Sequence, residues 1–342
     1  MKYSILQNPL ILNENDWKRF VNEHPAGNIF YLPEMLNLYN STSGSIPVFL
    51  ACVDSSDVLQ GLIIGVIQSS KVSFLRSFTS RCIIWGGPLV KDNSTLITDL
   101  LLQELNKTIS KKTVYIQFRN LVNVLYSNQV FINNNYRYED HLDILINLRK
   151  GENLLWKDLH ATRKKQISRS IKRGCSVEVK RMLDDASLHK CYYLLKETYH
   201  RIGLPYPEES FFKSAFVQLA GKNYIRVFLA MHSGEIIAFR FLLVYKELIY
   251  DWYAASDQVQ QDKYPNDLLP WEILTWGTKN GFTIFDFGGA GRPEVKYSVR
   301  DYKMKFGGEL VNYGRYNKIN KPMLFLIGKT VLRTSQLLKS LL

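Results

Sequence analysis

Apolar residues follow two different spacings along this chain, and together they predict a mixed α/β protein. Two β-rich runs, PVFLACV and VLQGLIIGVI, are joined by the turn-forming DSSD and predict a hairpin. Residues 94–110 instead repeat apolar positions at helical spacing. CIIWGGPLV, VYIQF and YEDHLDILINL predict further strands around that helix. The first half is therefore predicted to fold as strands, a helix and more strands.

The pattern changes near residue 150, where the segment DLHATRKKQISRSIKR predicts a strongly basic helix that ends at Gly174. The order then repeats: strand SVEVKR, helices over 187–201 and 208–220, and strands YIRVFLAMH, EIIAFRFLLVY and LIYDWYAAS. A helix over DLLPWEILTWGTKNG follows, in which we expect Pro270 to be tolerated only near the first turn. TIFDF and ELVNYGRY predict the closing strands. We therefore expect a fold-level duplication, with domains over residues 1–150 and 151–316 and with residues 317–342 packing back on the first.

Composition and charge narrow the class of protein. A chain of 342 residues is long enough for about two domains, and its formal net charge of +13 favours an anionic partner such as nucleic acid, a phosphorylated substrate or an acidic lipid surface. The cysteines at 52, 82, 175 and 191 are spaced too irregularly for a zinc site or a disulfide framework, so we expect buried, reduced thiols. We expect no metal, because the six histidines form no HExxH or close pair. The N-terminal sequence has no signal-peptide pattern, which predicts a cytoplasmic protein.

Two stretches carry a resemblance to a known family. They are WKDLHATRKKQISRSIKRG with the strand VEVKR, and FDFGG with YKMKFGG downstream. Together they resemble the Fem-type aminoacyltransferases and related proteins of the GNAT superfamily, over an order of elements that runs from about Ile29 to Tyr316. The resemblance implies an α+β fold with two GNAT-like domains, each built on a mixed sheet. It also implies transfer of an aminoacyl group from aminoacyl-tRNA to an amine of a lipid- or nucleotide-linked cell-envelope precursor, such as a peptidoglycan stem peptide.

The match to the family is incomplete in three places. The family pattern Phe-Lys-x-x-Phe-Gly stands here as Tyr302 to Gly307, so the family's functional lysine corresponds to Lys303 and Tyr302 replaces a phenylalanine. No segment has the length for a coiled-coil arm. The segment NIFYLPEMLNLYN lacks the lysine that bridge enzymes use to hold a nucleotide-linked precursor.

Aminolysis of an ester needs a neutral amine, a route for its proton and stabilisation of the tetrahedral oxyanion. Lys303 suits the last role, and Asp286, which follows the alternating strand TIFDF, is the supporting catalytic candidate. A turn-forming role for Asp286 and a solvated surface role for Lys303 stay open, and the general base is unassigned.

The candidate substrate-binding residues come from four segments. GGAGRPE lacks the spacing of a dinucleotide loop and predicts a flexible loop before a substrate-facing segment. Arg163, Lys164 and Arg169 of the basic helix can contact phosphates, or they can form a solvated face. The full set of candidates is Arg163, Lys164, Arg169, Asp251, Tyr253, Arg292, Lys296, Arg300, Tyr302 and Phe306.

The sequence leaves alternatives for the acyl donor and for the location of the protein. No resident cofactor is expected, and acyl-CoA is disfavoured as co-substrate because DQVQQDKYPNDLLPW after YDWYAAS has no glycine for a pyrophosphate loop. The rival readings are an acyl-CoA-dependent transferase acting on an amino sugar in capsule or lipopolysaccharide synthesis, and a non-catalytic anion-binding protein. Residues 321–342 are amphipathic and either dock on the first domain or lie on the inner face of a membrane. The sequence does not indicate an oligomeric state.

Overall fold

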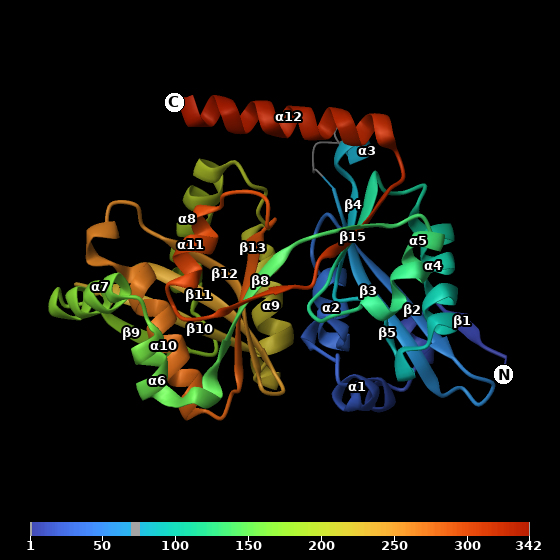
Figure 1. Cartoon of the computed structure of the whole chain (residues 1–342), viewed down its shortest axis with the longest axis horizontal. Coiled ribbons are helices and arrows are strands. Elements are labelled where there is room, and N and C mark those ends of the chain that lie inside the picture. The colour runs from blue at the N-terminus through green and yellow to red at the C-terminus, as the bar shows by residue number, and fades with distance from the viewer. Residues whose placement is uncertain (1, 70–75, 342) are drawn as a thin grey trace. The chain divides into compact units, whose positions relative to one another are not determined.

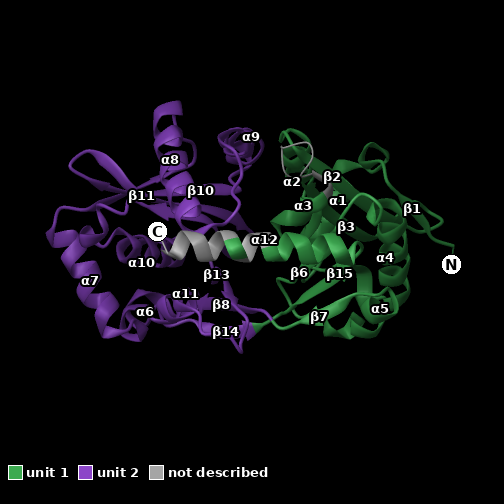
Figure 2. Cartoon of the chain, turned by 90° about the horizontal axis from the view of Figure 1, so that it is seen from above, with its two compact units in different colours: residues 1–140, 312–338 green, residues 141–311, 339–342 purple. Residues whose placement is uncertain are grey.

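The computed structural model describes residues 2–69 and 76–341, and the chain divides into two compact units (Figure 2). Unit 1 comprises residues 1–140 and 312–338, and unit 2 comprises residues 141–311 and 339–342. The division falls at Asp140. Strand β8 (Leu142–Asn147), which we assigned from the sequence to the end of the first domain, lies in the sheet of unit 2, where Ile144 and Ile146 join the core.

Unit 1 is built on one mixed sheet of eight strands (Figure 1). The strands are β1 (Ser4–Leu6), β2 (Ser45–Val53), β3 (Leu59–Gln68), β4 (Arg81–Trp85), β5 (Leu89–Val90), β6 (Tyr115–Arg119), β7 (Arg137–Glu139) and β15 (Arg315–Ile319). Their order is β1-β2-β3-β4-β6-β15-β7, with β5 paired to β3. The predicted β2–β3 hairpin is confirmed, and β4 and β6 form a parallel pair because helix α4 (Thr95–Ile109) crosses between them.

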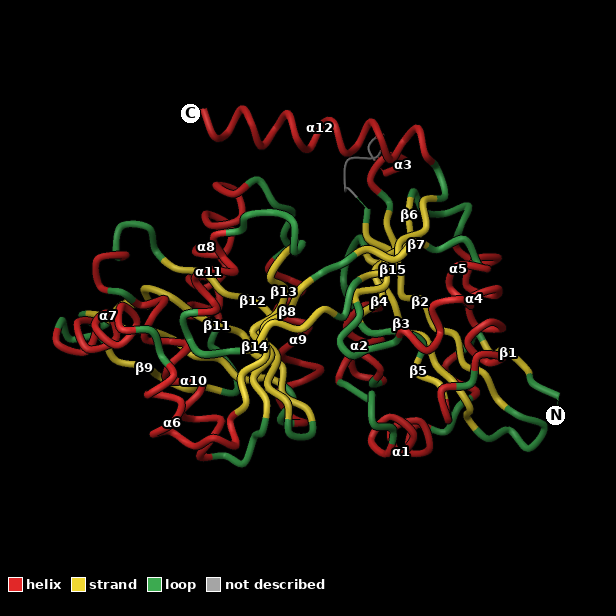
Figure 3. The backbone as a smooth tube through the Cα atoms, viewed as in Figure 1, coloured by secondary structure: helices red, strands yellow, loops and turns green. Residues whose placement is uncertain are grey.

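Helices lie on both faces of the sheet of unit 1 (Figure 3). Within residues 2–69 and 76–140 the helices are α1 (Glu14–Glu23), α2 (Pro33–Asn40), α3 (Arg76–Thr79), α4 and α5 (Asn128–Asn133). The core on one face joins Leu101 and Leu105 of α4 to Ile116 and Phe118 of β6. All four cysteines of the chain are free and buried, as expected.

Unit 2 repeats the plan with a seven-stranded sheet. Besides β8, its strands are β9 (Ser176–Lys180), β10 (Ile225–His232), β11 (Glu235–Tyr245), β12 (Leu248–Ser256), β13 (Ile284–Gly291) and β14 (Glu309–Asn312). The order is β14-β8-β13-β12-β11-β10-β9, and β12 and β13 are parallel because helix α10 (Pro265–Lys279) crosses between them. Three antiparallel strands, a helix and a parallel strand therefore follow one another in both units, with α3 and the short strand β5 inserted in unit 1.

Two sets of helices cover the sheet of unit 2. On one face α6 (Gly151–Asp158), α7 (Ala161–Lys172) and α10 enclose a core that includes Leu155, Ile167 and Leu269. On the other face α9 (Glu209–Leu219) packs Phe212 and Phe216 on Phe241 of β11, and α8 (Asp185–Ile202) lies against β11 and β12. Helix α11 (Ser298–Met304) packs on β13.

The structure corrects several predicted boundaries. The predicted basic helix DLHATRKKQISRSIKR begins at Ala161 and not at Asp158, because Asp158 ends the preceding helix α6 and His160 is the N-cap of α7. Gly174 has a φ of +79° and ends the segment as predicted. CIIWGGPLV divides into β4 and β5. ELVNYGRY divides into β14 and β15, which belong to the sheets of different units.

The C-terminal segment begins in unit 1. Strand β15 pairs with β6 and β7, and helix α12 (Pro322–Leu341) follows, with Phe325 edge-on to Tyr115 of β6 at 5.4 Å. Met323, Leu326 and Ile327 are exposed. Leu342 and the side chains of 331–333 and 335–341 lie outside the described residues, so an amphipathic face over the whole of 321–342 stays a prediction.

Candidate active site

The sheet of unit 2 opens between its two parallel strands. Strands β12 and β13 pair at only three positions, from Leu248 with Ile284 to Tyr250 with Asp286. In unit 1 the equivalent strands β4 and β6 pair along the full length of β4, from Arg81 to Trp85. Beyond Asp286 the backbone groups that face the opening between β12 and β13 are therefore available to side chains or to a substrate.

A β-bulge lies at the start of this opening. Phe241 of β11 pairs with Tyr253 while its neighbour Leu242 pairs with Asp251, so Trp252 is an extra residue in β12. Residues two apart normally share a face, but the bulge sends Asp251 towards Arg240 and Tyr253 towards Phe212 of α9. The two predicted site residues Asp251 and Tyr253 are thus placed on opposite faces of the sheet.

Lys303 reaches the opening from helix α11. Its Nζ donates to the carbonyl oxygen of Phe287 and, at 3.1 Å, to that of Gly289, both on the part of β13 that has left β12. The ammonium also lies 5.3 Å from the ring centroid of Phe287. Burial lowers the pKa of Lys303, while the nearby carboxylates, first of all Asp251, oppose the shift. Two carbonyl oxygens therefore hold the partly buried amino group of Lys303, in contrast to the solvated lysine that the sequence left open.

Asp286 is buried beside it, with 3% of its surface exposed. Its Oδ1 accepts a hydrogen bond of 2.7 Å from the backbone N–H of Gly288, whose φ is +72°. Burial, together with the charge of Asp143, raises the pKa of Asp286 to about 7. The segment GGAG after it continues strand β13 as far as Gly291, so the prediction of a flexible loop there is wrong. A carboxyl group that titrates near neutrality can exchange a proton with a substrate.

Two buried ion pairs surround this centre. Arg240 of β11 pairs with Asp251, and Arg163 of α7 pairs with Asp267 of α10, and each of the four side chains is at most 12% exposed. Burial raises the pKa of Asp267 to about 6, against the charges of Arg163 and Arg240. Arg240 and Asp267 were not predicted from the sequence. The signal for Arg240 was a single arginine within the apolar strand EIIAFRFLLVY, where a charge needs a buried partner.

The motif YKMKFGG joins α11 to the rest of unit 2. Pro270 lies in the second turn of α10 and lacks the N–H that would bond the carbonyl oxygen of Asn266. The hydroxyl of Tyr302 donates to that carbonyl oxygen instead. Arg163 lies over the rings of Tyr302 and Phe306, at 5.1 and 6.0 Å from the centroids, and Phe306 is fully buried. Tyr302 and Phe306 therefore position the motif from inside the core.

The remaining basic candidates are distributed over two surfaces. Lys164 of α7 donates to the carbonyl oxygen of Lys157, and Arg169 is exposed. Arg300 donates to the carbonyl oxygens of Arg292 and Val295 and so closes the turn after β13. Arg292 and Lys296 are exposed on that turn. Arg163 stands apart from these residues because its guanidinium is in the buried ion pair.

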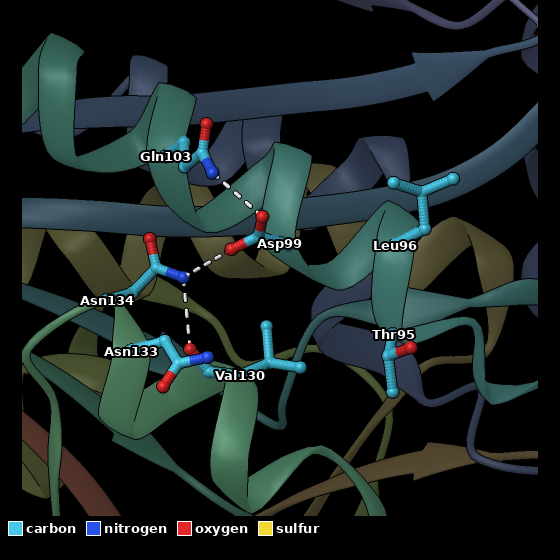
Figure 4. Close-up of a pocket in the computed structure, with 7 residues that line it drawn as sticks. All are labelled: Thr95, Leu96, Asp99, Gln103, Val130, Asn133 and Asn134. Atoms are coloured by element: carbon cyan, nitrogen blue, oxygen red, sulfur yellow. Dashed lines mark hydrogen bonds between the residues drawn. The ribbon is translucent and has the colours of Figure 1, made fainter.

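Unit 1 has a polar surface depression of about 600 Å³ between α4 and the end of α5 (Figure 4). Its carboxylate, Asp99, accepts hydrogen bonds from Gln103 at 2.7 Å and from Asn134 at 2.6 Å (Figure 4). Both oxygens of this carboxylate are thus engaged by neighbouring side chains. Within residues 2–69 and 76–341 no cluster of three or more His, Cys, Asp or Glu side chains is arranged to hold a metal ion.

Comparisons with known proteins identify the fold that carries this site. Residues 161–304, which contain the opening and Lys303, match the family model of the acetyltransferase (GNAT) domain. The solved structure of FemX is similar over 96% of this chain and 100% of its own, with a TM-score of 0.71 and 16% identity. The match to the family model identifies residues 161–304 as an acetyltransferase (GNAT) domain, and the fold of the chain is similar to that of FemX.

Two further solved structures resemble the fold of this chain at low sequence identity. One is a tandem GNAT protein from the clavulanic acid biosynthesis pathway, with a TM-score of 0.62, 8% identity and coverage of 93% and 98% of the two chains. The other is the C-terminal domain of a putative lysylphosphatidylglycerol synthetase from Agrobacterium fabrum, with a TM-score of 0.60, 14% identity and coverage of 93% and 95%. No curated protein matches the chain in sequence. The resemblance drawn from the motifs is confirmed at the level of fold.

Proposed function

We propose that the protein transfers an aminoacyl group from aminoacyl-tRNA to an amine of a cell-envelope precursor, at the opening between β12 and β13. The observation that carries this proposal is the position of Lys303, whose ammonium stands where the two parallel strands separate. The similarity to FemX and to a lysylphosphatidylglycerol synthetase domain supports an aminoacyl group as the cargo.

In this reaction the acceptor amine attacks the carbonyl carbon of the aminoacyl ester, a C–N bond forms, and the C–O bond to the ribose then breaks. Lys303 uses two of its three N–H groups on the carbonyl oxygens of Phe287 and Gly289. The third N–H can bind the oxyanion of the tetrahedral intermediate. Asp286 takes the proton that the amine loses and gives a proton to the ribose oxygen as that oxygen leaves, so the carboxylate is regenerated.

The exposed face of α7 is the proposed tRNA contact. Lys165, Arg169 and Lys172 are all exposed, and their spacing of four and three residues puts them on one side of the helix. Three cations in a row can follow the phosphates of a nucleic acid backbone, whereas the buried Arg163 holds the helix in place from its inner face.

The proposed acceptor is a class of molecules, the amines of cell-envelope precursors. The alternative donor is acyl-CoA. The segment between β12 and α10 has no glycine, so a pyrophosphate would have to be bound without the usual flexible loop. We also propose contact with the inner face of a membrane through the exposed apolar residues at the start of α12. Of the described helices, none combines the length and the apolar character that a membrane span requires.

Binding of charged and uncharged tRNA tests the proposal, measured at two salt concentrations beside acetyl-CoA. The wild type should bind aminoacyl-tRNA in a salt-dependent manner. A triple variant with Lys165→Glu, Arg169→Glu and Lys172→Glu should bind the tRNA more weakly. The slope of its log K against log salt concentration should be smaller by up to about 3. Reversal of Lys107, Lys111 and Lys112, which are exposed in unit 1, is the matched control. Tight acetyl-CoA binding without tRNA binding would favour the rival acyl-CoA-dependent transferase.

A further inference from the structure

A second buried carboxyl group lies near Asp286, and the mechanism proposed above does not use it. Asp143 of β8 is 9% exposed, and Asp286 of β13 is 3% exposed. The two strands are antiparallel neighbours, with Asp286 opposite Leu145 and Gly289 opposite Asp143. Aspartate side chains are seldom buried. Two of them on adjacent strands, at the level where Lys303 is held, therefore point to a role in the site.

Both carboxyl groups lie on the same face of the sheet. Phe285 and Phe287, which flank Asp286, belong to the core that α6, α7 and α10 enclose, and so does Ile144, which follows Asp143. Side chains alternate between the two faces along a strand. Asp143 and Asp286 therefore both project from the face opposite to this core.

A β-bulge directs the side chain of Asp286 along its strand towards Asp143. Between the pairs Asp286–Leu145 and Gly289–Asp143, β13 has one residue more than β8. Gly288 in this bulge has a φ of +72°, and its N–H donates to Oδ1 of Asp286 at 2.7 Å. The carboxyl group thus lies against the residue before Gly289. Opposite residues of antiparallel strands are about 5 Å apart, so Asp143 is its neighbour.

The other charged groups close to Asp286 are held by partners of their own. Asp251 of β12 is in the ion pair with Arg240. Lys303 of α11 donates to two carbonyl oxygens of β13. The remaining ionisable residues of the segments that pack on β13 are Tyr250 and Tyr253 of β12, Arg300, Asp301 and Tyr302 of α11, and Arg149 and Lys150 before α6. Asp143 contributes the carboxyl group that shares both the face and the level of Asp286.

Two neighbouring carboxyl groups in a buried site do not titrate independently. Their negative charges repel each other, so the pair binds its first proton at a higher pH than an isolated carboxyl group and its second proton at a much lower pH. Burial and then the charge of Asp143 raise the pKa of Asp286, whereas Lys303 lowers it. A pair that already holds one proton is a poor acceptor for another. The first titration step therefore decides when Asp286 can act as a base.

We propose that Asp143 and Asp286 share a single proton, and that Asp143 is thereby the positioning residue that sets the pH above which Asp286 can take the proton of the acceptor amine. The proposal rests on the function proposed above and adds the pH regulation of the same site. The amine proton becomes the one proton of the pair, and it passes to the ribose oxygen as the C–O bond breaks. Asp143 makes no bond to the substrate.

The experiment titrates the side-chain carboxyl carbons of the aspartates by ¹³C NMR. Asp143→Asn keeps the size of the side chain and removes its charge, so it should lower the titration midpoint of Asp286 by about one pH unit or more. Asp286→Asn should lower the midpoint of Asp143 by the same amount, because coupling between two binding sites is reciprocal. Asp140→Asn is the matched control, since Asp140 is an exposed aspartate just before β8, and it should leave Asp286 unchanged.

The same variants are then assayed for transfer from aminoacyl-tRNA as a function of pH. In the wild type kcat/KM should fall as the pH drops through the titration of Asp286 in the free enzyme. In Asp143→Asn this fall should occur lower by about one pH unit or more, whereas Asp140→Asn should follow the wild type. A merely structural role of Asp143 would lower the rate at every pH without moving the fall.

An unchanged midpoint of Asp286 in Asp143→Asn overturns the inference, and so does an equal shift in Asp140→Asn. If Asp143→Asn does not fold, the titration of Asp143 in Asp286→Asn decides the question. If the wild type transfers an aminoacyl group but the two carboxyl groups titrate independently, the shared proton is wrong and the function stands. If they titrate as a coupled pair but nothing is transferred from aminoacyl-tRNA, the pair stands and the function is wrong.

Discussion

Asp286 offers a prediction in which stability and activity move in opposite directions. The variant Asp286→Asn keeps an oxygen to accept the hydrogen bond from Gly288 and removes the negative charge. Burial raises the pKa of the folded carboxyl from 3.8 to about 7. The folded state therefore binds the proton more tightly than the unfolded state, and the protein loses stability as the pH rises from about 4 to about 7.

The size of the effect follows from the shift. Each pKa unit corresponds to about 1.4 kcal/mol, so the ionised carboxylate costs on the order of 2–4 kcal/mol above pH 7. The variant should therefore be more stable than the wild type at pH 8 by about that amount, and the gain should shrink at pH 5. For a unit of this size, a gain of 3 kcal/mol corresponds to roughly 6–12 °C in Tm.

The assay is scanning calorimetry of both proteins at pH 5 and pH 8, with aminoacyl transfer measured in parallel. Asp301→Asn, an exposed aspartate on α11, is the control and should show no such pH-dependent gain. We expect transfer by Asp286→Asn to be lost while its Tm rises at pH 8. A variant less stable than the wild type at pH 8, or a difference independent of pH, would refute the reasoning.

Three further predictions follow from the contacts of the site and the exposed helix. Lys303→Met should lower kcat by about a hundredfold or more with the fold intact by circular dichroism, and a variant with unchanged kcat would remove Lys303 from the mechanism. Tyr302→Phe should lower the free energy of urea unfolding by about 1–3 kcal/mol when residue 270 is proline. The loss should be smaller in a Pro270→Ala background, because residue 270 then regains its N–H. Equal losses in both backgrounds would contradict the exchange of partners at the carbonyl oxygen of Asn266. Leu326→Ser with Ile327→Ser should reduce cosedimentation with phosphatidylglycerol vesicles, whereas Thr330→Ser should not; equal binding by all three proteins would exclude α12 as the membrane contact.

Much of the fold was accessible from the sequence because its signals are local. The strands β2, β3, β10, β11 and β12 are long runs of apolar residues, and α4 carries its apolar positions at helical spacing. The start of α7 at Ala161 was missed because the cap at His160 acts through one side chain. The strand identity of Gly288 to Gly291 was missed because glycine favours turns unless pairing with β8 overrides that preference.

The candidate site also combines features that the sequence predicts with features that depend on the tertiary structure. By itself the sequence determined the mixed α/β class, the repeated order of elements and the motif that contains Lys303. Only the tertiary structure decided that Lys303 fills the opening between β12 and β13, that Arg163 is buried against Asp267, and that a bulge sends Asp251 and Tyr253 to opposite faces. The physical reason is that burial and strand register set the charge state and direction of these side chains, and both arise from segments far apart in the chain.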